Sequence, residues 1–139
     1  MSARARTFEY DVELDRGWVA RSSEGGTAIP NEGEAWTPEH LVLAGLCRCT
    51  LASFRFHARR AGLEPQASAS AHGIVTRREE DGRFAFVEIV VSIDVVLDPA
   101  PAPEALSELI DKGERDCFVG ASLTTKPTYR WTVNGQETT

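Results

Sequence analysis

Three cysteines, Cys47, Cys49 and Cys117, are the residues of this sequence that point most directly to chemistry. A thiolate is a strong nucleophile and a metal ligand, and two thiols that meet in a fold can form a disulfide. Cys47 and Cys49 lie two positions apart in a segment with a helical pattern, so their side chains point about 200° apart. They cannot share a metal ion or a disulfide, and at most one of them faces a common site with Cys117.

The neighbours of each cysteine on this predicted helix suggest different roles. The face of Cys49 also holds three small residues, Gly45, Ala52 and Ser53. The face of Cys47 holds three larger ones, Leu43, Leu51 and Phe54. Cys47 is therefore predicted to be a buried and inert thiol, as free cysteines often are. Cys49 is either the reactive thiol or a small residue at a contact between helices.

Other kinds of chemistry have less support in the sequence. It contains no glycine-rich phosphate loop, no G-x-S-x-G turn and no H-E-x-x-H zinc motif. The histidines, His40, His57 and His72, are scattered, and we interpret them as partly exposed polar residues rather than zinc ligands. No metal ion or cofactor is expected.

Length, composition and charge limit the class of protein. The chain has 139 residues, of which 42% are hydrophobic and 26% charged, which predicts one domain over residues 1–139 with a real core. The net charge of −6 argues against a nucleic-acid partner, because such partners bind basic surfaces. No apolar run approaches the ~18 residues of a membrane span, and the first residues lack the apolar region of a signal peptide. We expect a soluble, cytoplasmic protein.

A long helix must position Cys47 and Cys49. Thr37 predicts its N-cap, Pro38 its first position and Glu39 an acid in its first turn, and the helix should end near Gly62. Apolar residues lie all around this segment, so we expect a helix that is buried on most sides.

The remaining elements follow from alternating apolar residues, turn signals and breaks. The expected strands are Phe8–Leu14, Trp18–Ser22, Thr27–Pro30, Ala67–Glu80, Arg83–Asp98 and Thr125–Val133. Asp81-Gly82 predicts a hairpin, and a second helix is expected from Glu104 to about Cys117. This order predicts an α+β fold with a mainly antiparallel sheet packed around the two helices.

Two segments resemble a known family. Residues 37–49 read TPEHLVLAGLCRC, which resembles the signature P-E-x-L-x-x-A-x-x-x-x-C on the long central helix of the OsmC/Ohr family. Residues 115–123 read RDCFVGASL and resemble the second cysteine box of that family, with Phe118 and Gly120 in place of its usual proline and serine. The resemblance implies an intertwined α+β homodimer and a thiol peroxidase that acts on organic hydroperoxides.

The resemblance also assigns roles by position. Cys49 corresponds to the thiol that attacks the peroxide, and Cys117 to the thiol that then forms a disulfide with it. Glu39 matches the acid of the organic-hydroperoxide branch. The arginine of that branch falls on Arg16, counted back from the turn at residues 22–25, with Arg21 as the alternative.

These residue types suit the implied reaction. A free cysteine has a pKa of about 8.5, and a guanidinium beside Cys49 would favour the thiolate that attacks the O–O bond. Glu39 would orient the arginine through a bidentate pair. The product at Cys49 is a sulfenic acid, which Cys117 converts to a disulfide before further oxidation. An external dithiol, in the family often a lipoylated protein, would then reduce the disulfide.

The helix itself predicts a shared site. Ten residues separate Glu39 from Cys49, which places them about 15 Å apart along a continuous helix and about 80° apart around it. Glu39 would therefore serve Cys49 of the other chain in a homodimer. Two alternatives remain: a relative with another thiol substrate, and a dimeric binding or stress-associated protein with a hydrophobic ligand pocket and little or no peroxidase activity.

Overall fold

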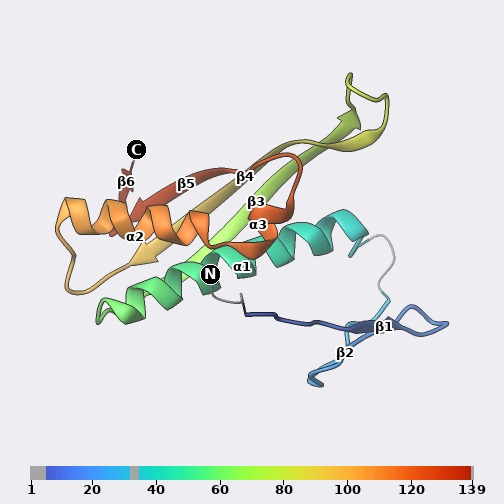
Figure 1. Ribbon diagram of the computed structural model, residues 1–139, viewed down its shortest axis with the longest axis horizontal. Helices are drawn as coiled ribbons and strands as arrows, with labels where there is room; N and C mark the ends of the chain where they lie inside the picture. Colours follow the sequence, from blue (N-terminus) through green and yellow to red (C-terminus); the bar gives the residue numbers. More distant parts are fainter. Residues whose placement is uncertain (1–5, 32–34, 139) are drawn as a thin grey trace, which may run out of the picture. The chain divides into compact units, whose positions relative to one another are not determined.

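The computed structural model describes residues 6–31 and 35–138. Within it the chain divides into two compact units, one that ends at Pro38 and one that begins at Glu39 (Figure 1). The single domain over residues 1–139 stays a prediction.

The N-terminal unit contains a short antiparallel strand pair, β1 (Val12–Leu14) and β2 (Ala20–Ser22). Asp15 closes the connecting turn, because its Oδ1 atom accepts the backbone N–H groups of Gly17 at 2.9 Å and of Val19 at 3.1 Å. The sequence placed this hairpin correctly but predicted longer strands.

Two details of this unit differ from the prediction. Trp18, expected in a strand, lies in the turn with φ of 64°, and the expected return strand is reduced to a single bridge between Ala20 and Ile29. The alternating apolar residues are exposed rather than half-buried, as Tyr10 (73%) and Val12 (67%) show. Two strands of three residues cannot form a layer that would cover them.

The second unit begins with the long helix α1 (Pro38–Arg60), which is unbroken over 23 residues. The predicted start at Thr37-Pro38-Glu39 and the stop near Gly62 are both confirmed, since Gly62 follows the helix with φ of 82°. The expectation of burial on most sides is wrong for a single chain. Only one stripe, spaced four residues apart, is buried: Leu46, Thr50, Phe54 and Ala58.

A four-stranded sheet supports this stripe. Its strands are β3 (Gln66–Arg77), β4 (Phe84–Val96), β5 (Thr128–Val133) and β6 (Gln136–Thr138), and they are ordered β3-β4-β5-β6. The pairs β3–β4 and β5–β6 are antiparallel, and β4–β5 is parallel. The sheet is therefore mixed, and the predicted α+β fold with mainly antiparallel pairing is confirmed.

A bulge in the β3–β4 hairpin changes which side chains of β4 face the core. Ile89, Val91, Ile93 and Val95 are buried as predicted, but the register shifts at Ile74/Val75. Because one extra residue reverses the alternation, Phe86 instead of Val87 packs against the core beyond that point.

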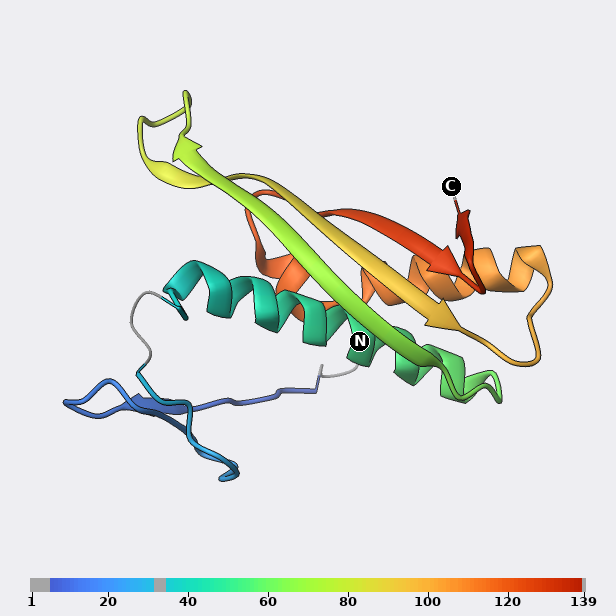
Figure 2. The ribbon, with the colours of Figure 1, turned by 180° about the vertical axis from the view of Figure 1, so that it is seen from behind.

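Helix α2 (Pro103–Arg115) and the short helix α3 (Phe118–Ser122) complete the unit. Helices α1 and α2 lie on the same face of the sheet in both ribbon views (Figures 1 and 2). The second helix ends two residues before the predicted Cys117, and that cysteine instead forms the N-cap of α3. Both α3 and β6 were missed by the sequence analysis.

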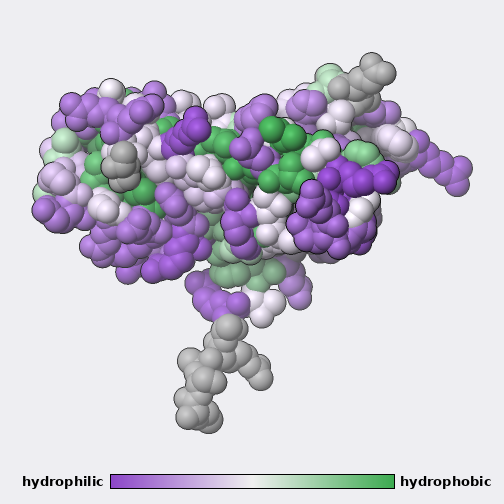
Figure 3. All heavy atoms as spheres, turned by 90° about the horizontal axis from the view of Figure 1, so that it is seen from above, coloured by the Kyte–Doolittle hydropathy of each residue, from purple (hydrophilic) through white to green (hydrophobic). Residues whose placement is uncertain are grey.

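Several large apolar side chains of α1 are not covered by the described residues of the second unit. Leu41 (42%), Val42 (38%) and Phe56 (57%) are exposed and do not belong to the hydrophobic core beneath the helix. Hydrophobic side chains are visible among hydrophilic ones on the surface shown in Figure 3. Large apolar side chains that are exposed in this way favour burial against another chain.

Candidate active site

The structure brings Cys49 and Cys117 together, although they are 68 positions apart in the sequence. The Sγ atom of Cys49 accepts the backbone N–H of Val119 at 3.4 Å, and Sγ of Cys117 accepts that of Gly120 at 3.4 Å. Both sulfurs are therefore held by consecutive amides at the start of α3. Cys117 is fully buried and Cys49 is half-buried, so Cys49 is the thiol of this pair that a substrate can reach.

Gly120 makes this close arrangement possible. A Cβ atom at this position would lie 2.5 Å from the hydroxyl of Tyr129 and 3.4 Å from Sγ of Cys117. Gly120, which stands in place of the family's usual serine, thus leaves the space that the Tyr129 hydroxyl occupies. A larger side chain would displace that hydroxyl or move α3.

Two hydroxyl groups beside Cys117 were not predicted from the sequence: that of the fully buried Thr50 and that of the partly buried Tyr129. Oγ1 of Thr50 lies 3.5 Å from Sγ of Cys117 and donates to the Leu46 carbonyl at 2.9 Å. The sequence does hold a signal for Thr50, because it is a polar residue in a row of apolar residues spaced four positions apart. Nothing in the sequence indicates that Tyr129, from a strand near the other end of the unit, reaches the same place.

Cys47 lies apart from this pair. It lines a cavity of about 660 Å³ between α1 and the beginning of β3, together with Arg48 and Arg55. The thiol is half-buried rather than buried, and its burial raises its pKa. The prediction that Cys47 and Cys49 face different surroundings is confirmed.

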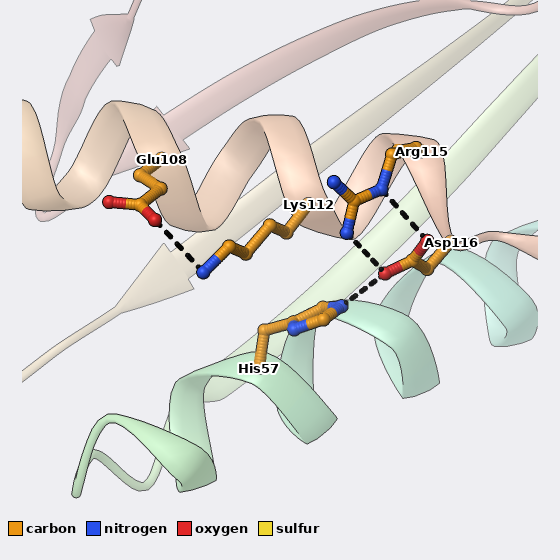
Figure 4. A network of polar contacts seen from close by, with 5 residues as sticks. All are labelled: His57, Glu108, Lys112, Arg115 and Asp116. Atoms are coloured by element: carbon orange, nitrogen blue, oxygen red, sulfur yellow. Dashed lines mark hydrogen bonds and ion pairs between the residues drawn. The ribbon is translucent and has the colours of Figure 1, made fainter.

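A network of charged groups fixes the residue before Cys117 (Figure 4). Asp116 binds Arg115 through two hydrogen bonds of 3.0 Å and contacts Nε2 of His57 at 2.7 Å. Arg115 in the first place, and His57 in addition, hold the pKa of the Asp116 carboxyl at about 2. This network joins α1 to the end of α2, and it gives His57 a structural partner.

Burial raises the pKa of the Cys49 thiol above its usual value. The backbone N–H groups of Val119 and Phe118 oppose this shift, while the neighbouring Cys117 adds to it. The groups of the second unit that act on Cys49 therefore favour the thiol. A thiolate at neutral pH needs a positive charge from elsewhere.

The structure does not bring Glu39 to Cys49 of the same chain. Both residues belong to the unbroken helix α1, so ten residues at ~1.5 Å each separate them by about 15 Å. Glu39 is exposed in the first turn. Its predicted role therefore requires a second chain.

The two candidate arginines lie in the N-terminal unit, and they differ in their contacts. Arg21 is bound to Asp15, with Nη1 of the arginine 2.7 Å from Oδ2 of the carboxylate. Within the described part of that unit, Arg16 forms no ion pair and is exposed in the turn after β1. Of the two, Arg16 is the one whose guanidinium is available to a new partner.

The structure adds two negative findings. Among residues 6–31 and 35–138, no cluster of three or more histidine, cysteine or acidic side chains is placed to hold a metal ion. None of the helices described is long and apolar enough to cross a membrane.

Comparison with known proteins establishes the family. The OsmC-like protein family matches residues 31–132, so the chain belongs to the OsmC-like family. This confirms the resemblance drawn from the two cysteine segments. No curated protein sequence matches the chain.

Solved structures show the same fold at low sequence identity. An OsmC-like protein of unknown function from Vibrio cholerae is 16% identical, with a TM-score of 0.73 over 91% of this chain and 100% of that one. An organic hydroperoxide resistance protein OsmC from Legionella pneumophila is 18% identical (TM-score 0.59, 94% and 98% covered). The organic hydroperoxide resistance protein OhrB of Bacillus subtilis is 20% identical (TM-score 0.54, 93% and 98% covered).

Proposed function

We propose that this protein is a thiol-dependent peroxidase that reduces organic hydroperoxides to alcohols. One observation carries the proposal: two cysteines distant in sequence, Cys49 and Cys117, meet on consecutive backbone amides, one accessible and the other buried. Membership of a family that includes organic hydroperoxide resistance proteins supports a redox role in general.

The reaction proceeds in three balanced steps. The thiolate of Cys49 attacks one oxygen of the peroxide O–O bond, which leaves a sulfenic acid on Cys49 and an alkoxide that takes a proton to become an alcohol. The thiol of Cys117 attacks the sulfenic sulfur, which forms the disulfide and releases water. A dithiol reductant, with a lipoylated protein as the candidate, then reduces the disulfide by exchange.

Arg16 supplies the charge that Cys49 lacks in its own surroundings. Its guanidinium favours the thiolate and stabilises the negative charge that develops on the leaving oxygen. Glu39 orients this arginine through a bidentate pair. Because Glu39 is too far along α1 from its own Cys49, we assign it to the cysteine of the partner in a homodimer.

The exposed apolar surface supports the dimer and the class of substrate. Leu41, Val42 and Phe56 leave α1 partly uncovered, and a second copy of the chain would bury them. Cys49 packs against the hydrophobic core, and such apolar surroundings favour an alkyl or fatty-acid hydroperoxide over hydrogen peroxide.

A thiol count after peroxide treatment tests the proposal. Reduced protein treated with tert-butyl hydroperoxide should lose two of its three thiols, and peptide mapping should identify a Cys49–Cys117 disulfide. Cys49→Ser should abolish peroxide consumption, and Cys117→Ser should allow one turnover before Cys49 stalls or over-oxidises. Cys47→Ser is the matched control and should stay active. An inactive Cys47→Ser with an active Cys49→Ser would reverse the assignment.

One observation favours a second candidate function, a dimeric binding protein with a hydrophobic ligand pocket. The raised pKa of Cys49 is a property of an unreactive thiol. Thiol titration separates the two, because an enzyme has one fast cysteine of low pKa whereas a binding protein has three slow thiols.

A further inference from the structure

Cys117 is buried in a polar environment that its proposed role as second thiol does not by itself explain. Thr50 and Cys117 are both fully buried, and the hydroxyl of Tyr129 reaches the same space over Gly120. Buried hydroxyls in a core cost free energy unless they form hydrogen bonds. The presence of the Thr50 and Tyr129 hydroxyls beside one sulfur therefore indicates a role that apolar side chains could not perform.

The hydrogen bonds around the resting thiol follow from the protons that each group has to donate. The single hydroxyl proton of Thr50 is donated to the Leu46 carbonyl at 2.9 Å, so Oγ1 faces Cys117 as an acceptor for its S–H group. The backbone N–H of Gly120 already donates to the same sulfur. The thiol is thus oriented from two sides.

The same groups can stabilise the thiolate. A hydroxyl rotates freely about its C–O bond, so Thr50 can turn its proton toward a negative sulfur. Hydrogen bonds to a charged acceptor are stronger than those to a neutral one. The pKa of Tyr129 is raised by burial first and by the neighbouring Cys117 second, which keeps its phenol protonated as a donor.

Building on the proposed peroxidase function, we propose that Thr50 and Tyr129 are positioning residues that orient Cys117 and stabilise its thiolate while it attacks the sulfenic acid of Cys49. The new S–S bond forms as the S–O bond breaks. The proton lost by Cys117 leaves with the hydroxyl group as water.

Thr50→Val and Tyr129→Phe remove the hydroxyls with little change of shape, and single-turnover kinetics measures their effect. Disulfide formation from the sulfenic acid should slow about tenfold or more in each variant, as loss of a hydrogen bond to a charged group implies. The pH midpoint of this step should rise by about one unit, because the thiolate of Cys117 then has one hydrogen-bond donor fewer. Sulfenic acid formation at Cys49 should be unchanged.

Two further variants separate this role from one in packing. Thr50→Ser keeps the hydroxyl and should retain the rate of disulfide formation. Thr128→Val changes an exposed residue beside Tyr129 and should have no effect. Equal rates and pH midpoints in Thr50→Val, Tyr129→Phe and the unaltered protein would overturn the proposal.

A titration without peroxide tests the proposal independently of the enzyme activity. With Cys47 and Cys49 both changed to serine, Cys117 is the remaining thiol, and its ionisation can be followed by NMR of ¹³C-labelled cysteine. Adding Thr50→Val should raise the ionisation midpoint, and an unchanged midpoint would refute the role of Thr50. Failure of the unaltered protein to form a sulfenic acid would instead refute the proposed peroxidase.

Discussion

Mixing two defective subunits tests the shared site directly. One subunit carries Cys49→Ser and lacks the attacking thiol, while the other carries Glu39→Ala and lacks the orienting acid. In a dimer of one of each, Cys49 of the second subunit meets the intact Glu39 of the first. The second site of the same dimer lacks both residues.

The structure determines how much peroxidase activity the mixture should recover. Because α1 is continuous from Pro38 to Arg60, Glu39 and Cys49 of one chain stay about 15 Å apart, and no glutamate side chain spans that gap. Random exchange of equal amounts makes half of the dimers mixed, each with one complete site of two. The mixture should therefore reach about a quarter of the unaltered activity per subunit.

The assay follows consumption of tert-butyl hydroperoxide with excess dithiol, after subunit exchange verified by native mass spectrometry. A mixture of Cys49→Ser with Cys117→Ser is the matched control. It should show no more than the single turnover expected of Cys117→Ser alone, because both cysteines of a site come from one chain. If exchange is complete and the first mixture gains no activity above that of Glu39→Ala alone, the shared-site argument is wrong.

Three further predictions concern stability and ionisation. Phe54→Ala removes a fully buried ring that packs 4.9 Å from the Trp131 ring, and urea unfolding should show a loss of about 3–5 kcal/mol. Asp116→Asn should lower stability above about pH 4, and the difference should vanish as the pH falls toward 2, because the native carboxylate has a lowered pKa and loses its charge there. Arg16→Ala should raise the pKa of Cys49, measured by the pH dependence of thiol alkylation, whereas Arg21→Ala should have a smaller effect.

The sequence predicted the elements that depend on local signals. Thr37, Pro38 and Gly62 place the ends of α1 through capping chemistry, and Asp81-Gly82 places the long hairpin. The hairpin between β5 and β6 carries an equally local signal, Asn134-Gly135, whose two positive φ angles suit its tight turn. The sequence therefore carries a local signal for this turn, although β6 is not among the elements predicted from it.

Other features depend on packing between distant segments. The apolar pattern of α1 is the same on all sides, so it cannot tell which stripe meets the sheet and which faces outward. The parallel pairing of β4 with β5 depends on how α2 and α3 return the chain. Tyr129 reaches Cys117 because Gly120 leaves room, and no spacing in the sequence encodes that meeting.

The surroundings of Cys49 link its reactivity to assembly. Burial raises the pKa of its thiol, and the backbone amides of Val119 and Phe118 act against that shift without reversing it. The described residues of the second unit thus favour the protonated form of the attacking cysteine. If the opposing charge comes from Arg16 held by the partner's acid, as proposed, then forming the dimer creates the thiolate as well as the shared site. Dilution below the dissociation constant of the dimer would then abolish the fast reaction with peroxide while leaving Cys49 and Cys117 side by side.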